Sequence, residues 1–154
     1  MSEVTGQDPF DLERFVAAQD QDGTYNYALA ELQGGRKSTH WMWFVFPQLA
    51  GLGQSTMSRK YAIRSLDEAR AYLGHIVLGT RLVECASVLA GTQGRTAEEI
   101  FGVIDAFKLQ SSMTLFIRAT PERDVFQHVL SQYYRGAPDP ATDHLLARLG
   151  IQGR

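Results

Sequence analysis

Several features that would assign a chain of 154 residues to a well-understood class are scarce or absent. The single cysteine, Cys85, excludes an internal disulfide and a cysteine-rich zinc site. No apolar run approaches the roughly 20 residues that a membrane-spanning helix needs. The N-terminus is polar and acidic, without the basic start and apolar middle of a secretory signal. We therefore expect a cytoplasmic protein without a membrane partner.

Patterns typical of β-strands are also scarce. The aromatic run at 41–46 has the composition of a short buried strand, but Pro47 ends it and no partner segment alternates cleanly. Apolar residues recur with helical spacing over much of the rest, most clearly at 73–89, 101–119 and 125–134. The sequence predicts one all-α domain, residues 8–150, with six or seven helices. We expect loose ends at residues 1–7 and 151–154.

Polar residues followed by helix-starting patterns set the expected helix boundaries. Ser65 and Thr96 are each followed three residues later by a glutamate, which is the pattern of a capping box. Asp8, Thr120 and Asp139 each precede a proline, as an N-cap residue precedes Pro in the first helical turn. Cys85 falls inside an apolar helical stretch, so we expect it to be a small buried residue.

Acidic residues are absent from residues 33–66, in a chain whose formal net charge is −2. This window carries +5, so the rest of the chain carries −7; its cations are Arg36, Lys37, Arg59, Lys60 and Arg64. Within it, residues 35–65 form one irregular connection that exceeds normal loop lengths, so we expect part of it to be helical or functional. The charge is either a chance cluster on a solvated face or a site for an anion. The net negative charge and the lack of a known motif argue against a nucleic-acid partner.

The predicted helix at 101–119 is apolar nearly all round, as in the centre of a bundle. At about 100° per residue, Asp105, Lys108 and Ser112 share one stripe, framed by Phe101 and Phe116. Asp105 and Lys108 are three residues apart, so one interpretation is a structural ion pair at the edge of the core. The other is a pocket in which Lys108 meets an anion and Asp105 acts as a base or orients another group.

His40 is the histidine best suited to proton chemistry, because hydroxyl and cationic residues surround it in KSTHWMW. We therefore expect His40, Asp105 and Lys108 as the catalytic set if a reaction occurs; an inert histidine at a helix end is the alternative. The other three histidines fall on different predicted helices without the spacing of metal ligands. We predict neither a metal nor a cofactor.

The aromatic side chains of the connection, Trp41 and Trp43 above all, are the kind that usually belong to a core. One ring is still able to offer its face to a base or sugar. The glycine-rich stretch at 51–55, GLGQS, matches part of a phosphate-binding loop but lacks the full spacing of that motif. Hydroxyl groups beyond it, including that of Ser58, can donate hydrogen bonds to an anion.

Three motifs resemble an uncharacterised, mainly bacterial family that is filed as a domain of unknown function. They are THWMWFVFPQLAGLG at 39–53, LGxRL at 78–82 and FGxxDxxKLxSSMTLF at 101–116. The resemblance covers about residues 8–145 and implies a mostly helical single domain, as in a mycobacterial member, without an established activity. Some members carry the label calpastatin, which a folded aromatic core does not support, because a disordered inhibitor has no such core.

The resemblance also draws attention to particular side chains. Besides the catalytic set, the candidate ligand-binding residues are Lys37, Thr39, Trp41, Trp43, Gln48, Ser58, Tyr61, Arg81, Ser111 and Ser112. The sequence departs from the usual family pattern at Ile76 and Thr80, where prolines are common. This departure leaves open whether a helix runs straight through residues 74–79.

Two functions follow from these patterns. The first is binding of a phosphorylated or nucleotide-like small molecule in a polar pocket framed by aromatics, with hydrolysis or transfer on that ligand. An N-glycosidase acting on an ADP-ribose-type substrate is one such reaction, by analogy alone. The alternative is a non-enzymatic protein-interaction module that uses an aromatic groove. Tryptophan rings exposed in a wide apolar patch would favour a protein partner, and rings buried around a polar hollow would favour a ligand.

Overall fold

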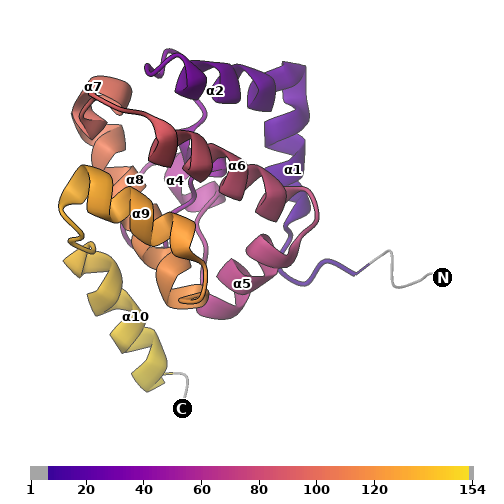
Figure 1. The fold of residues 1–154 in the computed structure, drawn as a ribbon. Helices are drawn as coiled ribbons and strands as arrows, with labels where there is room; N and C mark the ends of the chain where they lie inside the picture. The colour runs from indigo at the N-terminus through magenta and orange to yellow at the C-terminus, as the bar shows by residue number, and fades with distance from the viewer. Residues whose placement is uncertain (1–6, 153–154) are drawn as a thin grey trace.

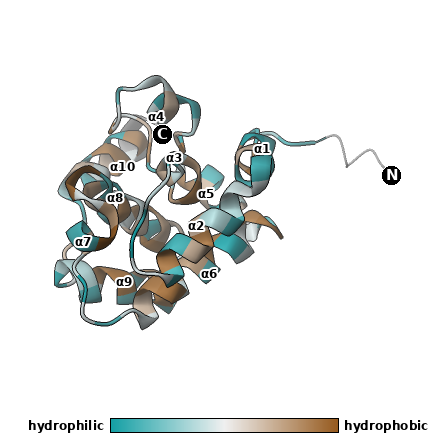
Figure 2. Cartoon of the chain, turned by 90° about the horizontal axis from the view of Figure 1, so that it is seen from above, coloured by the Kyte–Doolittle hydropathy of each residue, from teal (hydrophilic) through white to brown (hydrophobic). Residues whose placement is uncertain are grey.

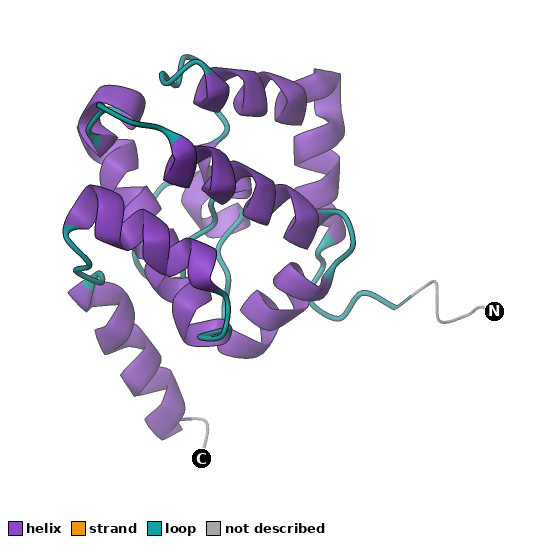
Figure 3. Ribbon diagram, in the orientation of Figure 1, coloured by secondary structure: helices purple, strands orange, loops and turns teal. Residues whose placement is uncertain are grey.

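The computed structural model describes residues 7–152, and the regular elements in that range are helices (Figure 3). Seven have eight residues or more: α1 (Glu13–Asp20), α2 (Thr24–Gln33), α5 (Leu66–Gly74), α6 (Leu78–Gly91), α8 (Val103–Ala119), α9 (Asp124–Tyr134) and α10 (Pro140–Gln152). Single turns form α3 (Met42–Val45), α4 (Thr56–Lys60) and α7 (Ala97–Phe101), and a 3-10 turn, η2 (Gln21–Gly23), joins α1 to α2.

The all-α single domain is confirmed, but the predicted number of helices was too low. The single-turn helices account for the difference, because so few residues cannot display a periodic apolar pattern. Two of them, α3 and α4, lie inside the long connection at 35–65. The expected loose ends at 1–7 and 151–154 fall largely outside the described residues.

Helix α8 lies at the centre of the bundle and packs against α5, α7, α9 and α10 (Figure 1). Every residue from 111 to 117 is buried, because neighbouring helices cover this half of α8 on all sides. In Figure 2, the outer turns of α1 and α2 are coloured mainly as hydrophilic, whereas α6 and α9 contain more hydrophobic residues. The core therefore sits between α8 and the helices that surround it.

The capping residues expected from the sequence do cap helices. The Ser65 hydroxyl accepts the N–H of Glu68 at 3.0 Å, and Thr96 forms a complete capping box with Glu99.

Two helices begin later than predicted. Asp8 does not start a helix at once; its carboxylate accepts N–H groups four and five residues further on, across a turn, and α1 begins at Glu13. Likewise α9 begins at Asp124, after a turn that contains the predicted start.

The sequence left open whether a helix runs straight through residues 74–79. In the structure the apolar stretch at 73–89 is divided between α5 and α6, whose axes differ by 88°. The His75 Nδ1 atom accepts the N–H groups of Val77 and Leu78 at 3.1 and 3.3 Å, which caps the start of α6. Gly79 then passes so close to α5 that a Cβ atom there would lie 1.9 Å from the Leu73 carbonyl oxygen. The chain thus turns sharply at 75–77 instead of continuing as one helix.

None of the described helices is by itself long and apolar enough to cross a membrane. Within the described range, the bent α5–α6 pair reaches that length and composition when its two helices are taken together.

The connection at 35–65 is closed on itself by one parallel β-bridge between Leu49 and Ile63. The Ala50 N–H donates to the Ile63 carbonyl at 2.7 Å, and the Ile63 N–H donates to the Gln48 carbonyl at 2.9 Å. These bonds bring the two ends of residues 51–61, which we call the closed loop, side by side. A Cβ atom at Gly51 would lie 3.3 Å from Leu145 of α10, so the closed loop rests against that helix.

Arg14 fastens α1 to the end of the closed loop and to α5. Its guanidinium pairs with Glu68 at 3.0 Å, and the two side chains are only 15% and 4% exposed. Its remaining N–H groups donate to four backbone carbonyls, those of residues 10, 11, 60 and 62. A single arginine therefore joins three segments of the chain.

Candidate functional site

Asp105 of α8 lies between two lysines. Its Oδ2 is 3.0 Å from Lys37 Nζ, and its Oδ1 is 3.5 Å from Lys108 Nζ. Lys37 Nζ also donates to the Thr39 carbonyl at 2.6 Å, and its side chain is only 8% exposed. The helical spacing predicted contact between Asp105 and Lys108, but Lys37 provides the shorter ion pair. Two ammonium groups sharing one carboxylate leave this lysine–aspartate cluster with a net charge of +1.

Each lysine of this cluster also lies near a tryptophan ring. Lys37 Nζ is 5.1 Å from the ring centroid of Trp41, and Lys108 Nζ is 5.2 Å from that of Trp43, distances typical of cation–π contacts. Trp41 is fully buried and Trp43 is partly buried, and both pack against the hydrophobic core. These rings are therefore not exposed together as a wide aromatic groove.

Glu31, near the end of α2, holds the start of the connection in place. Its carboxylate accepts hydrogen bonds from the Ser38 and Thr39 N–H groups, the Thr39 hydroxyl and the indole N–H of Trp41. Burial disfavours the ionised form, but these hydrogen bonds outweigh it, and the pKa of Glu31 lies below its usual value. Nothing in the sequence indicated this role, because the partners of Glu31 lie seven to ten residues further along the chain, beyond the end of α2.

We expect Asp105 and Lys108 of the lysine–aspartate cluster to contribute unequally to the free energy of unfolding. Asp105→Ala should lower the free energy of unfolding by about 2–3 kcal/mol, because it leaves two neighbouring ammonium groups without a counterion, one of them nearly buried. Lys108→Met should cost less than about 1 kcal/mol, because Asp105 keeps the shorter pair with Lys37. Urea denaturation of both variants measures the difference. Equal costs would show that the Lys37–Asp105 pair adds nothing to stability beyond the Lys108–Asp105 pair.

Two other predicted residues lie apart from this cluster. Arg81 of α6 pairs with Asp20 at 2.8 Å, donates to Gln19 at 3.2 Å and stacks 4.7 Å from the Tyr25 ring centroid. It therefore belongs to the α1–α6 interface and does not converge with Asp105. His40 is exposed and makes no hydrogen bond with any described residue, so the expected catalytic set is not assembled by direct contacts.

Three further predicted residues, Ser111, Ser112 and Tyr61, lie in the packed interior. Ser111 donates to Asp139 at 2.7 Å and so joins α8 to the start of α10. The Ser112 hydroxyl is fully buried without a hydrogen-bond partner among the described residues. Tyr61 is buried and packs against Phe15 and Phe44.

Cys85 is buried as expected, and that burial raises the pKa of its thiol to about 12. Its neutral thiol is therefore a poor nucleophile at neutral pH. Within residues 7–152, no group of three His, Cys, Asp or Glu side chains is close enough to hold a metal ion.

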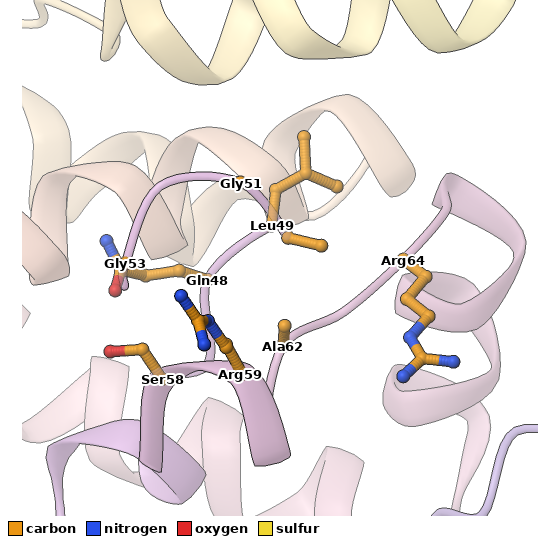
Figure 4. Close-up of a pocket in the computed structure, with 9 residues that line it drawn as sticks. Gln48, Leu49, Gly51, Gly53, Ser58, Arg59, Ala62 and Arg64 are labelled. Atoms are coloured by element: carbon orange, nitrogen blue, oxygen red, sulfur yellow. The ribbon is translucent and has the colours of Figure 1, made fainter. Parts of the chain in front are cut away.

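Gln48 and Ser58 line a hollow of about 200 Å³ beside the closed loop, which we call the loop hollow (Figure 4). The Arg59 side chain reaches toward both of them in Figure 4. The Ser58 hydroxyl oxygen accepts a hydrogen bond from Ser55 at 3.0 Å, so its own proton remains available to a ligand. A Cβ atom at Gly53 would lie 2.4 Å from the Ser58 oxygen, so the glycine allows the loop to fold over that hydroxyl.

The loop hollow is rich in hydrogen-bond donors and poor in negative charge. Arg59 makes one long hydrogen bond, to Gln54 at 3.4 Å. Among the described residues, no carboxylate is within ion-pair distance of Arg59 or of Arg64, which also lines the hollow. Both arginines belong to the cationic window seen in the sequence, but neither was among the predicted ligand-binding residues. An arrangement of this kind is suited to holding an anion.

Comparisons with known proteins agree with the motifs noted above. A family model described as "Protein of unknown function (DUF1810)" matches residues 9–146. The crystal structure of the conserved hypothetical protein Rv1873 from Mycobacterium tuberculosis is 54% identical in sequence, with a TM-score of 0.88. The match covers 91% of this chain and 99% of that one. No curated protein matches the sequence. The resemblance inferred from the motifs is confirmed, and the chain belongs to the DUF1810 family.

Proposed function

We propose that the protein binds a small anionic molecule, with a phosphate ester as the best-matched class, in the loop hollow. The observation that carries this proposal is the position of Arg59, whose guanidinium reaches toward Gln48 and Ser58 without a carboxylate partner among the described residues. A guanidinium offers paired N–H groups to two oxygens of a phosphate or carboxylate. The Ser58 hydroxyl, from the same helix as Arg59, and the Gln48 amide, from the connection before it, supply further donors.

The size of the loop hollow suits one anionic group. Its volume of about 200 Å³ is below the roughly 300–1,000 Å³ of pockets that enclose a drug-sized ligand. A phosphoryl group or a short carboxylic acid fits such a space, whereas a whole nucleotide does not. Among the described residues that line the hollow none is aromatic, so stacking of a base is not part of this proposal.

Binding, and not catalysis, is what the geometry supports. His40, Asp105 and Lys108 do not line the loop hollow, and Asp105 is already engaged by two lysines. Hydrolysis of the ligand, or transfer from it, therefore stays a prediction from the sequence. No described side chain near the hollow combines a nucleophile with a base in contact with it.

Titration of the full-length protein with inorganic phosphate and simple phosphate esters, at constant ionic strength, tests the proposal. We expect saturable binding by calorimetry and a rise in melting temperature that follows the ligand concentration. Arg59→Gln should weaken binding about tenfold or more, because it removes the charged partner of the anion. Arg36→Gln is the matched control: Arg36 belongs to the same cationic window and is exposed, but it does not line the hollow.

Two outcomes would contradict the proposal. The first is the absence of saturable binding by any of these anions at millimolar concentration. The second is an equal loss of binding in the Arg36 and Arg59 variants, which would show attraction to net charge without a defined site.

One observation favours the alternative of a protein-interaction module. Val103, Ile104 and Phe107 are 62%, 72% and 66% exposed on the first turns of α8. They form an apolar patch of a kind that partners often cover. The patch lies on α8 and not around the tryptophans, so the aromatic groove expected from the sequence is not its basis. Three side chains give a small surface compared with a stable interface, and we rank this function second.

A further inference from the structure

We infer that the ligand carries two separate anionic groups, as an organic bisphosphate does, and that the second group occupies a neighbouring hollow. This inference rests on the proposed function and deepens it. The neighbouring hollow, which we call the α1 hollow, has a volume of about 530 Å³ and lies between the start of α1, the end of α4 and the start of α5. Arg59 and Arg64 line both hollows, so the two spaces meet at these arginines.

The charges around the α1 hollow are not balanced. Arg14 and Glu68 lie in its wall, but their charges neutralise each other. The second carboxylate oxygen of Glu68 accepts a hydrogen bond from the backbone N–H of Arg64 at 2.9 Å and makes no contact with the Arg64 guanidinium within ion-pair distance. Arg14 has no further N–H group to offer, because its guanidinium already donates to four carbonyls. Binding in this hollow must therefore depend on the other cations.

Three exposed cations line the α1 hollow: Arg59, Lys60 and Arg64. Lys60 Nζ lies 5.3 Å from the ring centroid of Tyr61, and none of the three is within ion-pair distance of a described carboxylate. Asp11 is the one acid in the wall besides Glu68, so the unpaired charges of the described wall sum to about +2. If Arg59 served only an anion in the loop hollow, Lys60 and Arg64 would still leave positive charge in the α1 hollow without a partner.

The directions of the two shared arginines indicate two anions and not one. In Figure 4, the Arg59 guanidinium points toward Gln48 and Ser58, whereas the Arg64 side chain extends on the other side of Ala62 and away from them. One phosphoryl group seated beside Ser58 would meet Arg59 but not the tip of Arg64. A second anionic group in the α1 hollow would be within the field of Arg64 and Lys60.

The volumes agree with this division. The loop hollow holds a single phosphoryl group, and the α1 hollow lies within the roughly 300–1,000 Å³ typical of pockets for small organic ligands. A molecule that places one phosphate by Ser58 and its body and second phosphate over Lys60 would use both spaces. A monophosphate would leave the larger and more cationic space without an anion.

Calorimetric titration with fructose 6-phosphate and fructose 1,6-bisphosphate, at constant ionic strength, tests the inference. These sugars serve as probes that differ by one phosphate group. We expect the bisphosphate to bind about 30-fold tighter or more, because its second phosphate gains charged hydrogen bonds. Lys60 does not line the loop hollow, so Lys60→Gln should weaken the bisphosphate about tenfold and leave the monophosphate within about twofold. Arg64→Gln should weaken the bisphosphate about tenfold and the monophosphate less, because Arg64 lines both hollows but extends away from Ser58. Arg59→Gln should weaken both ligands, and Arg36→Gln neither.

The failures of the two proposals are distinguishable. If both sugars bind with equal affinity and Lys60→Gln changes neither, the two-anion inference is overturned while anion binding in the loop hollow stands. If the bisphosphate binds tighter but Lys60→Gln and Arg64→Gln have no effect, the second phosphate does not use the α1 hollow, and the inference is again overturned. If neither sugar binds, both proposals fail. Lys60 and Arg64 are exposed, so circular dichroism should show these variants folded as the parent is.

Discussion

Gly79→Ala should destabilise the protein by about 3 kcal/mol or more, enough to remove much of the stability of a typical domain. The added Cβ atom would lie 1.9 Å from the Leu73 carbonyl oxygen and 2.8 Å from its carbonyl carbon, well inside contact distance. Both partners are backbone atoms of packed helices, so no side chain can rotate to relieve the clash. Helices α5 and α6 would have to move apart at this corner, and the packing of α5 against α8 would change as a result. Guanidinium denaturation followed by circular dichroism measures the loss.

Gly91→Ala provides the control in the same helix. Gly91 is the last residue of α6, and an added Cβ atom there would meet nothing within 4 Å. We expect this substitution to be neutral or to stabilise by up to about 1 kcal/mol, because alanine reduces the conformational freedom of the unfolded chain. If both variants lost the same stability, the close approach at the corner would not be the cause.

Arg14→Met should lower the free energy of unfolding by about 3–5 kcal/mol. The substitution keeps an apolar side chain of similar length but leaves the Glu68 carboxylate, only 4% exposed, without its counterion. It also removes the donors of four backbone carbonyls at the ends of α1 and of the closed loop. Urea denaturation measures the loss, and we expect α1 to separate from the closed loop first.

Two further variants separate the buried charge from the lost packing. Arg118→Met breaks an ion pair with Asp143 whose side chains are 41% and 38% exposed, and should cost less than about 1 kcal/mol. Adding Glu68→Leu to Arg14→Met should recover part of the stability, because it removes the unpaired carboxylate. If the double variant Arg14→Met/Glu68→Leu is no more stable than Arg14→Met, the loss of stability comes instead from the four hydrogen bonds that Arg14 donates to backbone carbonyls.

The parts of this fold that the sequence predicted depend on local contacts. Thr96 and Ser65 cap helices through bonds to residues three positions away, so their pattern is visible in the sequence. The break at 75–77 was left open, because it depends on the approach of Gly79 to Leu73 in three dimensions. An apolar pattern that continues through both helices cannot reveal a corner between them.

In the candidate site, too, contacts between residues close in sequence were predicted and contacts between distant residues were not. Contact between Asp105 and Lys108 was predicted from helical spacing, whereas the shorter pair with Lys37 joins residues far apart in sequence. Gln48 and Ser58 were named from the family motifs, and the structure places both in the loop hollow. The role of Arg59 could not be predicted, because it depends on the β-bridge that folds the connection back on itself.

That bridge between Leu49 and Ile63 gives the protein a means of changing its ligand without changing its scaffold. The chain leaves and re-enters the bundle at two adjacent points, so residues can be inserted at the exposed positions 54–56 without displacing either anchor. The entropic cost of a longer segment between fixed ends rises only slowly with its length. Engineering of new binding preferences could therefore begin by grafting segments of different length and charge between these two anchors.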